Sequence, residues 1–176
     1  MDHVTEQAVA KQNKMLNEVL YIAAMIMMIF SGIVAFFLLQ MVMFAFDWGT
    51  LIFLLLEVGI AVGLFFMRDR LRVEYEYSFV NGSLDFAMIF NNKKRKNLGA
   101  LNVRTVDSFG PVNSDSFRRY VATPGVKVSN WFLNRGSELY FFYFQKEGNK
   151  RLIVLEPNDV LVDYIRHYVP VTNQVK

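Results

Sequence analysis

Two long apolar segments near the start of the chain constrain its fold more than any other feature. They run from about residue 19 to residue 46 and from about residue 50 to residue 67. Between residues 19 and 67 the only fully charged side chains are Asp47 and Glu57. A helix needs about 20 apolar residues to cross a hydrocarbon core of roughly 30 Å, whereas the apolar part of a signal peptide is much shorter. The sequence therefore predicts a transmembrane helical hairpin over 19–67, with its turn near 46–49.

The basic residues beside this hairpin predict its orientation. They lie before the first segment and after the second, whereas the connecting turn carries only Asp47. Cytoplasmic flanks of membrane helices are enriched in Lys and Arg. We therefore expect both termini in the cytoplasm, with these flanking cations on that side: Lys11, Lys14, Arg68, Arg70 and Arg72.

Small residues predict where the two helices pack. Gly59 and Gly63 form a GxxxG pattern, and an antiparallel hairpin places them level with Gly32 and Ala35. Small residues let helix backbones approach closely in lipid, so we expect an intramolecular seam at these positions. Two alternatives stay open, namely that the pattern arises by chance and that it mediates homo-oligomerisation.

Glu57 is an acid inside an apolar segment, and it needs an explanation. It lies near the predicted depth of Gln40, the other strongly polar side chain well inside the hairpin. A charged side chain at this depth is costly, so we expect Glu57 to be protonated or hydrogen-bonded to Gln40. The pair then joins the helices; an ion or proton role and a partner-binding role are the alternatives.

After residue 67 the pattern changes to that of strands. Residues 72–80 alternate apolar and polar side chains, and Asn81-Gly82 follows, which is a strong hairpin signal. The returning strand, residues 83–90, then places apolar residues opposite apolar ones. The predicted pairs are Val73 with Phe90, Tyr75 with Met88, Tyr77 with Phe86, and Phe79 with Leu84.

The remaining segments predict further strands and one terminal helix. Residues 98–110 hold one or two short strands, residues 120–134 a strand and turn of uncertain limits, and residues 137–155 a second hairpin about Gly148-Asn149. The first strand of that hairpin is apolar on both faces, which is typical of a central strand.

A helix closes the chain. It is expected to begin near Pro157 and to end at Pro170. Its predicted inner stripe consists of Val160, Leu161, Tyr164, Ile165 and Tyr168. The first 18 residues are expected to be a helical extension of the first apolar segment, from the spacing of Val4, Ala8, Met15 and Val19.

Residues 72–169 resemble the pleckstrin-homology-like (PH-like) fold. The residues that carry the likeness are VEYEYSFVNGSLDF, NVRTVDSFG and SELYFFYFQKEGNKRLIVLEPNDVLVDYI. With the hairpin in front, the chain is similar to small bacterial membrane proteins with a bacterial PH-like domain. The resemblance implies an α+β, strand-rich barrel or sandwich over residues 68–176, after an N-terminal segment (1–18) and the hairpin (19–67). It also implies the bacterial cytoplasmic membrane as the location and a binding or scaffolding role without catalysis. Fold alone does not identify the ligand.

A run of basic residues, NNKKRKN at 91–97, follows the first predicted hairpin. The returning strand brings this run back toward Arg68, Arg70 and Arg72, so Lys93, Lys94, Arg95 and Lys96 could contact anionic lipid together with them. The alternative is a solvated turn that keeps the hairpin soluble. Nucleic acid is not expected as a partner, because neither an aromatic platform nor a basic helical stripe accompanies the charges.

No pattern in the sequence predicts catalysis. The chain has no cysteine and two histidines far apart, and it lacks a phosphate-binding glycine loop or a nucleophile motif. We therefore expect no catalytic residue, no metal and no cofactor. The predicted function is a membrane-tethered interaction module with lipids and an unidentified protein as partners; a small transport or channel subunit using Glu57 is the alternative.

Overall fold

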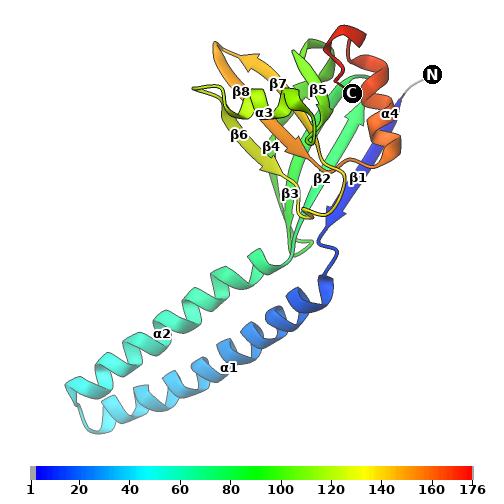
Figure 1. Cartoon of the computed structure of the whole chain (residues 1–176). Helices are drawn as coiled ribbons and strands as arrows, with labels where there is room; N and C mark the ends of the chain where they lie inside the picture. The colour runs from blue at the N-terminus through cyan, green and yellow to red at the C-terminus, as the bar shows by residue number, and fades with distance from the viewer. Residues whose placement is uncertain (1–2, 176) are drawn as a thin grey trace. The chain divides into compact units, whose positions relative to one another are not determined.

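The computed structural model describes residues 3–175 and divides the chain into two compact units (Figure 1). The hairpin unit comprises residues 13–73 and 90–94. The β unit comprises the residues up to 12, residues 74–89 and the residues from 95 onward. The β unit is therefore discontinuous in sequence, because the hairpin is inserted into it.

Two helices build the hairpin unit. Helix α1 spans Lys14–Phe44 and α2 spans Trp48–Arg68, followed by a 3₁₀ turn at Asp69–Leu71. Asp47 caps α2, since its carboxylate accepts a hydrogen bond of 2.9 Å from Thr50 N. Both helices are long and apolar enough to cross a membrane. The predicted helical hairpin and its turn are thus confirmed as secondary structure.

The two helices contact each other along a stripe that recurs every three or four residues. These positions lose solvent exposure, whereas most of the large apolar side chains around them stay exposed. Such spacing is typical of helices packed nearly parallel to each other. The stripe contains Ala24, Met28, Ser31, Ala35 and Leu38 of α1 and Leu54, Glu57, Ala61 and Leu64 of α2.

The predicted glycine seam is wrong. Gly32, Gly59 and Gly63 are exposed, and a Cβ placed on any of them meets no atom within 4 Å. Of the four residues predicted to pack the helices, Ala35 alone is half-buried. The reason is angular: the stripe on α2 passes through residues 57, 61 and 64, so Gly59 and Gly63 fall on the outer side of the helix.

Two sheets form the β unit, and together with its helices they give an α+β fold (Figure 1). The first sheet has the order β1-β2-β3-β4, with β1 Val4–Ala10, β2 Val73–Val80, β3 Ser83–Phe90 and β4 Lys94–Asn102. The second has the order β5-β7-β8-β6, with β5 Ser108–Pro111, β6 Lys127–Trp131, β7 Tyr140–Lys146 and β8 Asn149–Leu155. The helices are α3 Asp115–Val121 and α4 Asp159–Tyr168, and 3₁₀ turns lie at Val103–Thr105 and Val171–Asn173.

The expected N-terminal helix is instead strand β1. It pairs antiparallel with β2, from Val4 opposite Val80 to Ala10 opposite Glu74. Its less exposed positions include Gln7 and Val9, which alternate as in a strand. Gln7 lies on the less exposed face although it is polar. The sequence of β1 therefore lacks the alternation of apolar inner and polar outer residues by which a strand is recognised.

Both predicted β-hairpins are present. Asn81 and Gly82 have φ of 48° and 96°, and Glu147 and Gly148 have φ of 53° and 77°, the positive values that two-residue hairpin turns require. In the first hairpin, the ring centroids of Tyr77 and Phe86 lie 5.9 Å apart, as expected for an opposed pair. These two residues belong to the predicted register.

The main core fills the space between the sheets and beneath α4. Its fully buried members include Tyr77, Phe79, Phe86, Phe142, Leu155, Leu161 and Ile165. Phe141 and Tyr143 point to the opposite face of β7, where α3 covers them through Phe117 and Tyr120. Strand β7 is therefore central and covered on both faces, as predicted.

The helices correct two expectations. The sequence placed every strand before a single helix, whereas α3 intervenes between β5 and β6. Helix α4 begins and ends as expected, with Asn158 as its N-cap at 2.8 Å from Leu161 N. On its inner face Val162 is buried, whereas Val160 is 53% exposed.

Candidate functional site

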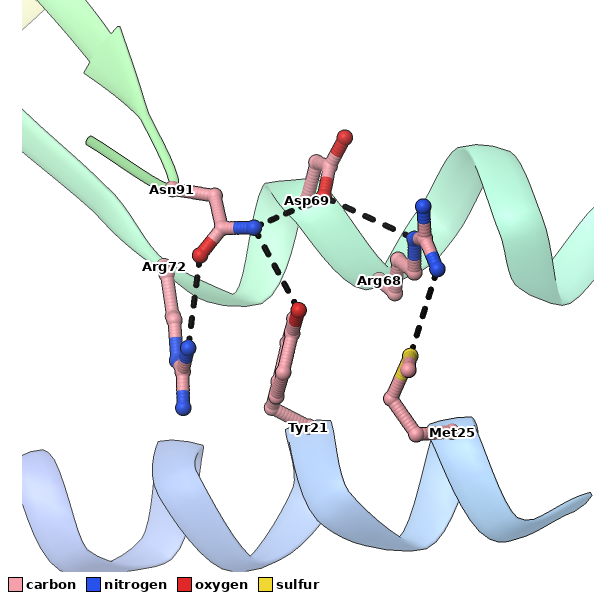
Figure 2. A network of polar contacts seen from close by, with 6 residues as sticks. All are labelled: Tyr21, Met25, Arg68, Asp69, Arg72 and Asn91. Atoms are coloured by element: carbon pink, nitrogen blue, oxygen red, sulfur yellow. Dashed lines mark hydrogen bonds and ion pairs between the residues drawn. The ribbon is translucent and has the colours of Figure 1, made fainter. Parts of the chain in front are cut away.

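A network of polar contacts joins the ends of α1 and α2 within the hairpin unit (Figure 2). The guanidinium of Arg72 lies 3.7 Å above the ring centroid of Tyr21 and forms an ion pair with Glu18. Cation-π contacts and ion pairs of this kind stabilise most where water is partly excluded. We call this the helix-end network; its members are Glu18, Tyr21, Met25, Arg68, Asp69, Arg72 and Asn91.

Asn91 connects the chain after β3 to this network. Its amide oxygen accepts a hydrogen bond of 3.3 Å from Arg72, and its amide nitrogen donates to Asp69 at 3.1 Å and to Tyr21 at 3.4 Å (Figure 2). Its backbone N donates to Arg72 O at 2.6 Å. Its φ of 48° is tolerated better by Asn than by most residues. Asn91 thereby fixes the start of the basic segment against the end of α2.

Arg68 is also held within the network. One of its terminal nitrogens lies 3.2 Å from the sulfur of Met25, its Nε lies 3.7 Å from Asp69, and its guanidinium lies 4.4 Å from the ring centroid of Phe65. Arg68 and Arg72, both predicted to contact lipid, therefore have partners inside the protein. Sequence reasoning missed Glu18, Tyr21 and Asn91, because these contacts join residues far apart in the chain.

The basic segment is only partly a turn. Lys93 lies in the turn, whereas Lys94, Arg95 and Lys96 belong to strand β4. Arg95 forms an ion pair with Glu76, a residue otherwise buried in the first sheet. Arg70, Lys93 and Lys94 are exposed members of the hairpin unit. Lys96 is exposed as well and belongs to the β unit.

The predicted contact between Gln40 and Glu57 is absent among residues 3–175. Gln40 is exposed near Phe37 and Thr50, whereas Glu57 lies in the helix stripe with its Oε2 buried and without a hydrogen-bond partner. The Arg68–Met25 contact gives the pairing of the helices, in which the residue numbers sum to 93. Glu57 is therefore about level with Phe36, and Gln40 lies about one turn further along α1.

A second polar cluster, centred on Glu156, lies in the β unit. The Glu156 carboxylate accepts hydrogen bonds from Leu133 N at 3.3 Å, from Asn134 N at 3.0 Å and from the Asn134 side chain at 2.8 Å. The Asn134 side chain also donates to Ala10 O at 3.0 Å, and the Gln7 side chain donates to Glu156 O at 3.0 Å. This cluster connects β1 to the ends of β6 and β8.

Tyr77 completes this cluster from the first sheet. Its hydroxyl donates to Trp131 O and accepts a hydrogen bond of 3.3 Å from Glu156 N. Desolvation by burial raises the pKa of Tyr77 well above its ordinary value, which outweighs the opposing effect of that backbone hydrogen bond. The tyrosine therefore stays neutral in the folded protein. Its contacts make the cluster structural, since every polar group in it is satisfied by another part of the fold.

A model described as Bacterial PH-like domain matches residues 1–174, so it covers β1 and the hairpin as well as the strand-rich part. No curated protein and no solved structure matches the chain. The two-sheet α+β fold with a terminal helix agrees with the family model. The chain belongs to the bacterial PH-like domain family DUF6106.

Proposed function

We propose that this protein is a membrane-tethered, non-enzymatic interaction module, in which the α1–α2 hairpin crosses the cytoplasmic membrane and the β unit lies in the cytoplasm. One observation carries the proposal. In the hairpin unit the small and polar residues of the stripe, including Ser31 and Glu57, lie between the helices, whereas large apolar side chains cover the outside. In water such a surface leads to aggregation, and in lipid it is the expected arrangement.

The helix-end network supports the same proposal. Tyr and Arg are favoured at the boundary between hydrocarbon and water, where an apolar stem and a polar tip are both accommodated. Tyr21, Arg68 and Arg72 belong to the helix-end network (Figure 2), and in the proposed arrangement they lie at this boundary. The network can thus set the depth at which the two helices leave the lipid.

The orientation can be tested with introduced cysteines, because the chain has none of its own. Phe46→Cys in the connecting turn is expected to react with a membrane-impermeant maleimide on intact cells. Asn113→Cys in the β unit is expected to react only after permeabilisation. Both sites are exposed, so accessibility in the folded chain does not limit the reaction. Labelling of Asn113→Cys in intact cells would show that the proposed orientation is wrong.

We further propose that Arg70, Lys93 and Lys94 contact anionic headgroups. They are exposed and belong to the same unit as the hairpin, and each basic residue near an anionic surface contributes about 1 kcal/mol. Changing all three to Gln should lower the preference for phosphatidylglycerol over phosphatidylcholine by about 100-fold in total. The measurement is lipid retention by the full chain, extracted from mixed nanodiscs and quantified by mass spectrometry.

A matched control removes the same charge elsewhere. Arg118, Arg119 and Arg135 are exposed residues of the β unit, and changing these three to Gln should leave lipid retention unchanged. An equal loss in both triple variants, or no loss in the first, would contradict direct headgroup contact.

The transport function considered from the sequence gains little support. A conduction path needs a series of polar groups, whereas Glu57 is the only fully charged side chain inside either apolar segment. Its place between the helices fits a role in joining α1 and α2, or in receiving a polar group from a partner helix. We therefore assign the hairpin an anchoring role.

A further inference from the structure

Cations occupy one end of the inner face of the second sheet, the face that is turned toward the apolar core. Residues on one face of a strand alternate, so Ile153 and Leu155, which point into the core between the sheets, share their face of β8 with Arg151. In the strand register, Arg151 lies opposite Phe144 of β7 on one side and opposite Lys127 of β6 on the other. The inner face of the second sheet therefore changes from apolar to cationic toward one end.

A cavity of about 220 Å³ lies at this end of the sandwich. Phe86, Trp131, Phe144 and Ile153 supply apolar walls, and the ring centroids of Phe86 and Trp131 lie 4.6 Å apart. Gly99 of β4 also lines it, and its φ of 137° is a conformation open to glycine. Three cations line the cavity, Lys127, Lys146 and Arg151, and its described lining contains no acidic residue.

Arg151 is the informative member of this group. Its Nε is buried without a hydrogen-bond partner, and no ion pair of Arg151 occurs within residues 3–175. An unpaired buried donor on a guanidinium is costly. Lys127 has an ordinary explanation, since inward charges on an edge strand such as β6 discourage aggregation. That explanation fails for Arg151, because β8 lies between β7 and β6.

We propose that this cavity binds a small anion with a compact apolar body, namely a carboxylate or phosphate monoester attached to an aromatic or short aliphatic group. The guanidinium of Arg151 receives the anionic oxygens, which supply the acceptor that its Nε lacks. Lys127 and Lys146 add charge, and Trp131 with Phe86 receives the apolar body. A cavity of this volume is below the range usual for drug-sized ligands, so it selects a compact molecule.

Trp131 provides a reporter inside the cavity. The chain has two tryptophans, so the variant Trp48→Phe leaves Trp131 as the only one. The experiment uses this full-length variant in phosphatidylcholine nanodiscs and titrates it with phenyl phosphate while Trp131 fluorescence is recorded. We expect a saturable change with phenyl phosphate and none with benzyl alcohol or phenyltrimethylammonium. The absence of a saturable change, or an equal change with the cation, overturns the proposal.

The role of Arg151 is tested in the same background. Arg151→Gln should weaken phenyl phosphate binding about tenfold or more, whereas Arg151→Lys should retain part of it. Lys150→Gln removes a neighbouring charge that does not line the cavity, and it should leave binding unchanged. Equal weakening by Arg151→Gln and Lys150→Gln would reduce the effect to general charge and overturn the site.

Folding of the variant and the source of the anion need separate measurements. Arg151→Gln removes a buried Nε that has no hydrogen-bond partner, so its melting temperature should equal or exceed that of the parent. Lys127→Gln, which removes an exposed cavity cation, serves as a second variant for which weaker binding is expected. Phosphatidylglycerol added to the nanodiscs should raise the apparent Kd for phenyl phosphate if a lipid headgroup occupies the cavity. An unchanged Kd identifies a soluble anion as the ligand; in both cases the cavity remains an anion site.

Discussion

A fragment that begins at residue 72 is expected to misfold and aggregate, although it contains every strand and helix of the β unit except β1. Without β1, the whole length of β2 from Glu74 to Val80 becomes an unpaired edge. Val9, which is 5% exposed in the main core, is lost as well, together with the hydrogen bonds of Gln7. Open apolar edges promote association between chains. Size-exclusion chromatography and thermal denaturation of the fragment are the measurements.

The matched variant keeps β1 and removes only the hairpin. Residues 13–72 are replaced by a short Gly/Ser loop, which turns β1 and β2 into an ordinary antiparallel pair, since Ala10 lies opposite Glu74. This variant should be monomeric and unfold cooperatively in water. If the fragment starting at residue 72 folded equally well, β1 would not be an essential part of the domain.

Phe86→Asp should unfold the β unit. Phe86 is 1% exposed and packs against Tyr77 and Trp131. Loss of a buried Phe side chain costs about 3 to 5 kcal/mol, and an unpaired carboxylate in the same place adds a further penalty. Because domains are stable by about 5 to 15 kcal/mol, the sum is enough to remove most or all of that stability.

The readout is near-ultraviolet circular dichroism of the full chain, which reports on packed aromatic side chains. Asp85→Ala, on the exposed face of the same strand, is the control and should change the free energy of unfolding by less than about 0.5 kcal/mol. A cooperative transition retained in Phe86→Asp would contradict the inward orientation of Phe86 and, with it, the register of β2 and β3.

The parts predicted correctly from the sequence are those with local signals. The two apolar helices follow from length and hydropathy, and the two hairpins follow from the turn signals Asn81-Gly82 and Gly148-Asn149. The second turn lies at Glu147-Gly148, one residue earlier than predicted. The double covering of β7 follows from its continuous apolar run. In each case the cause lies within a few residues of the element that it specifies.

The parts that were missed depend on contacts between distant residues. Strand β1 was missed because Gln7 points inward and is satisfied by Glu156 and Asn158, far along the chain. The pairing of Gln40 with Glu57 and the glycine seam were wrong, because matching by depth ignores the direction in which each side chain leaves its helix. Arg68 and Arg72 were assigned to lipid because a sequence does not reveal partners such as Tyr21 and Asn91.

The insertion of α1 and α2 between two paired strands has a mechanical consequence. The chain leaves the first sheet after β1 and returns to it in β2, at positions opposite each other in one ladder. A single proteolytic cut in the turn at residues 45–47 would therefore not separate the two fragments, because the hydrogen bonds between β1 and β2 still hold them together. If α1 and α2 were pulled apart, the force would open this ladder from the pair Ala10 and Glu74, the end of the ladder that adjoins the helices.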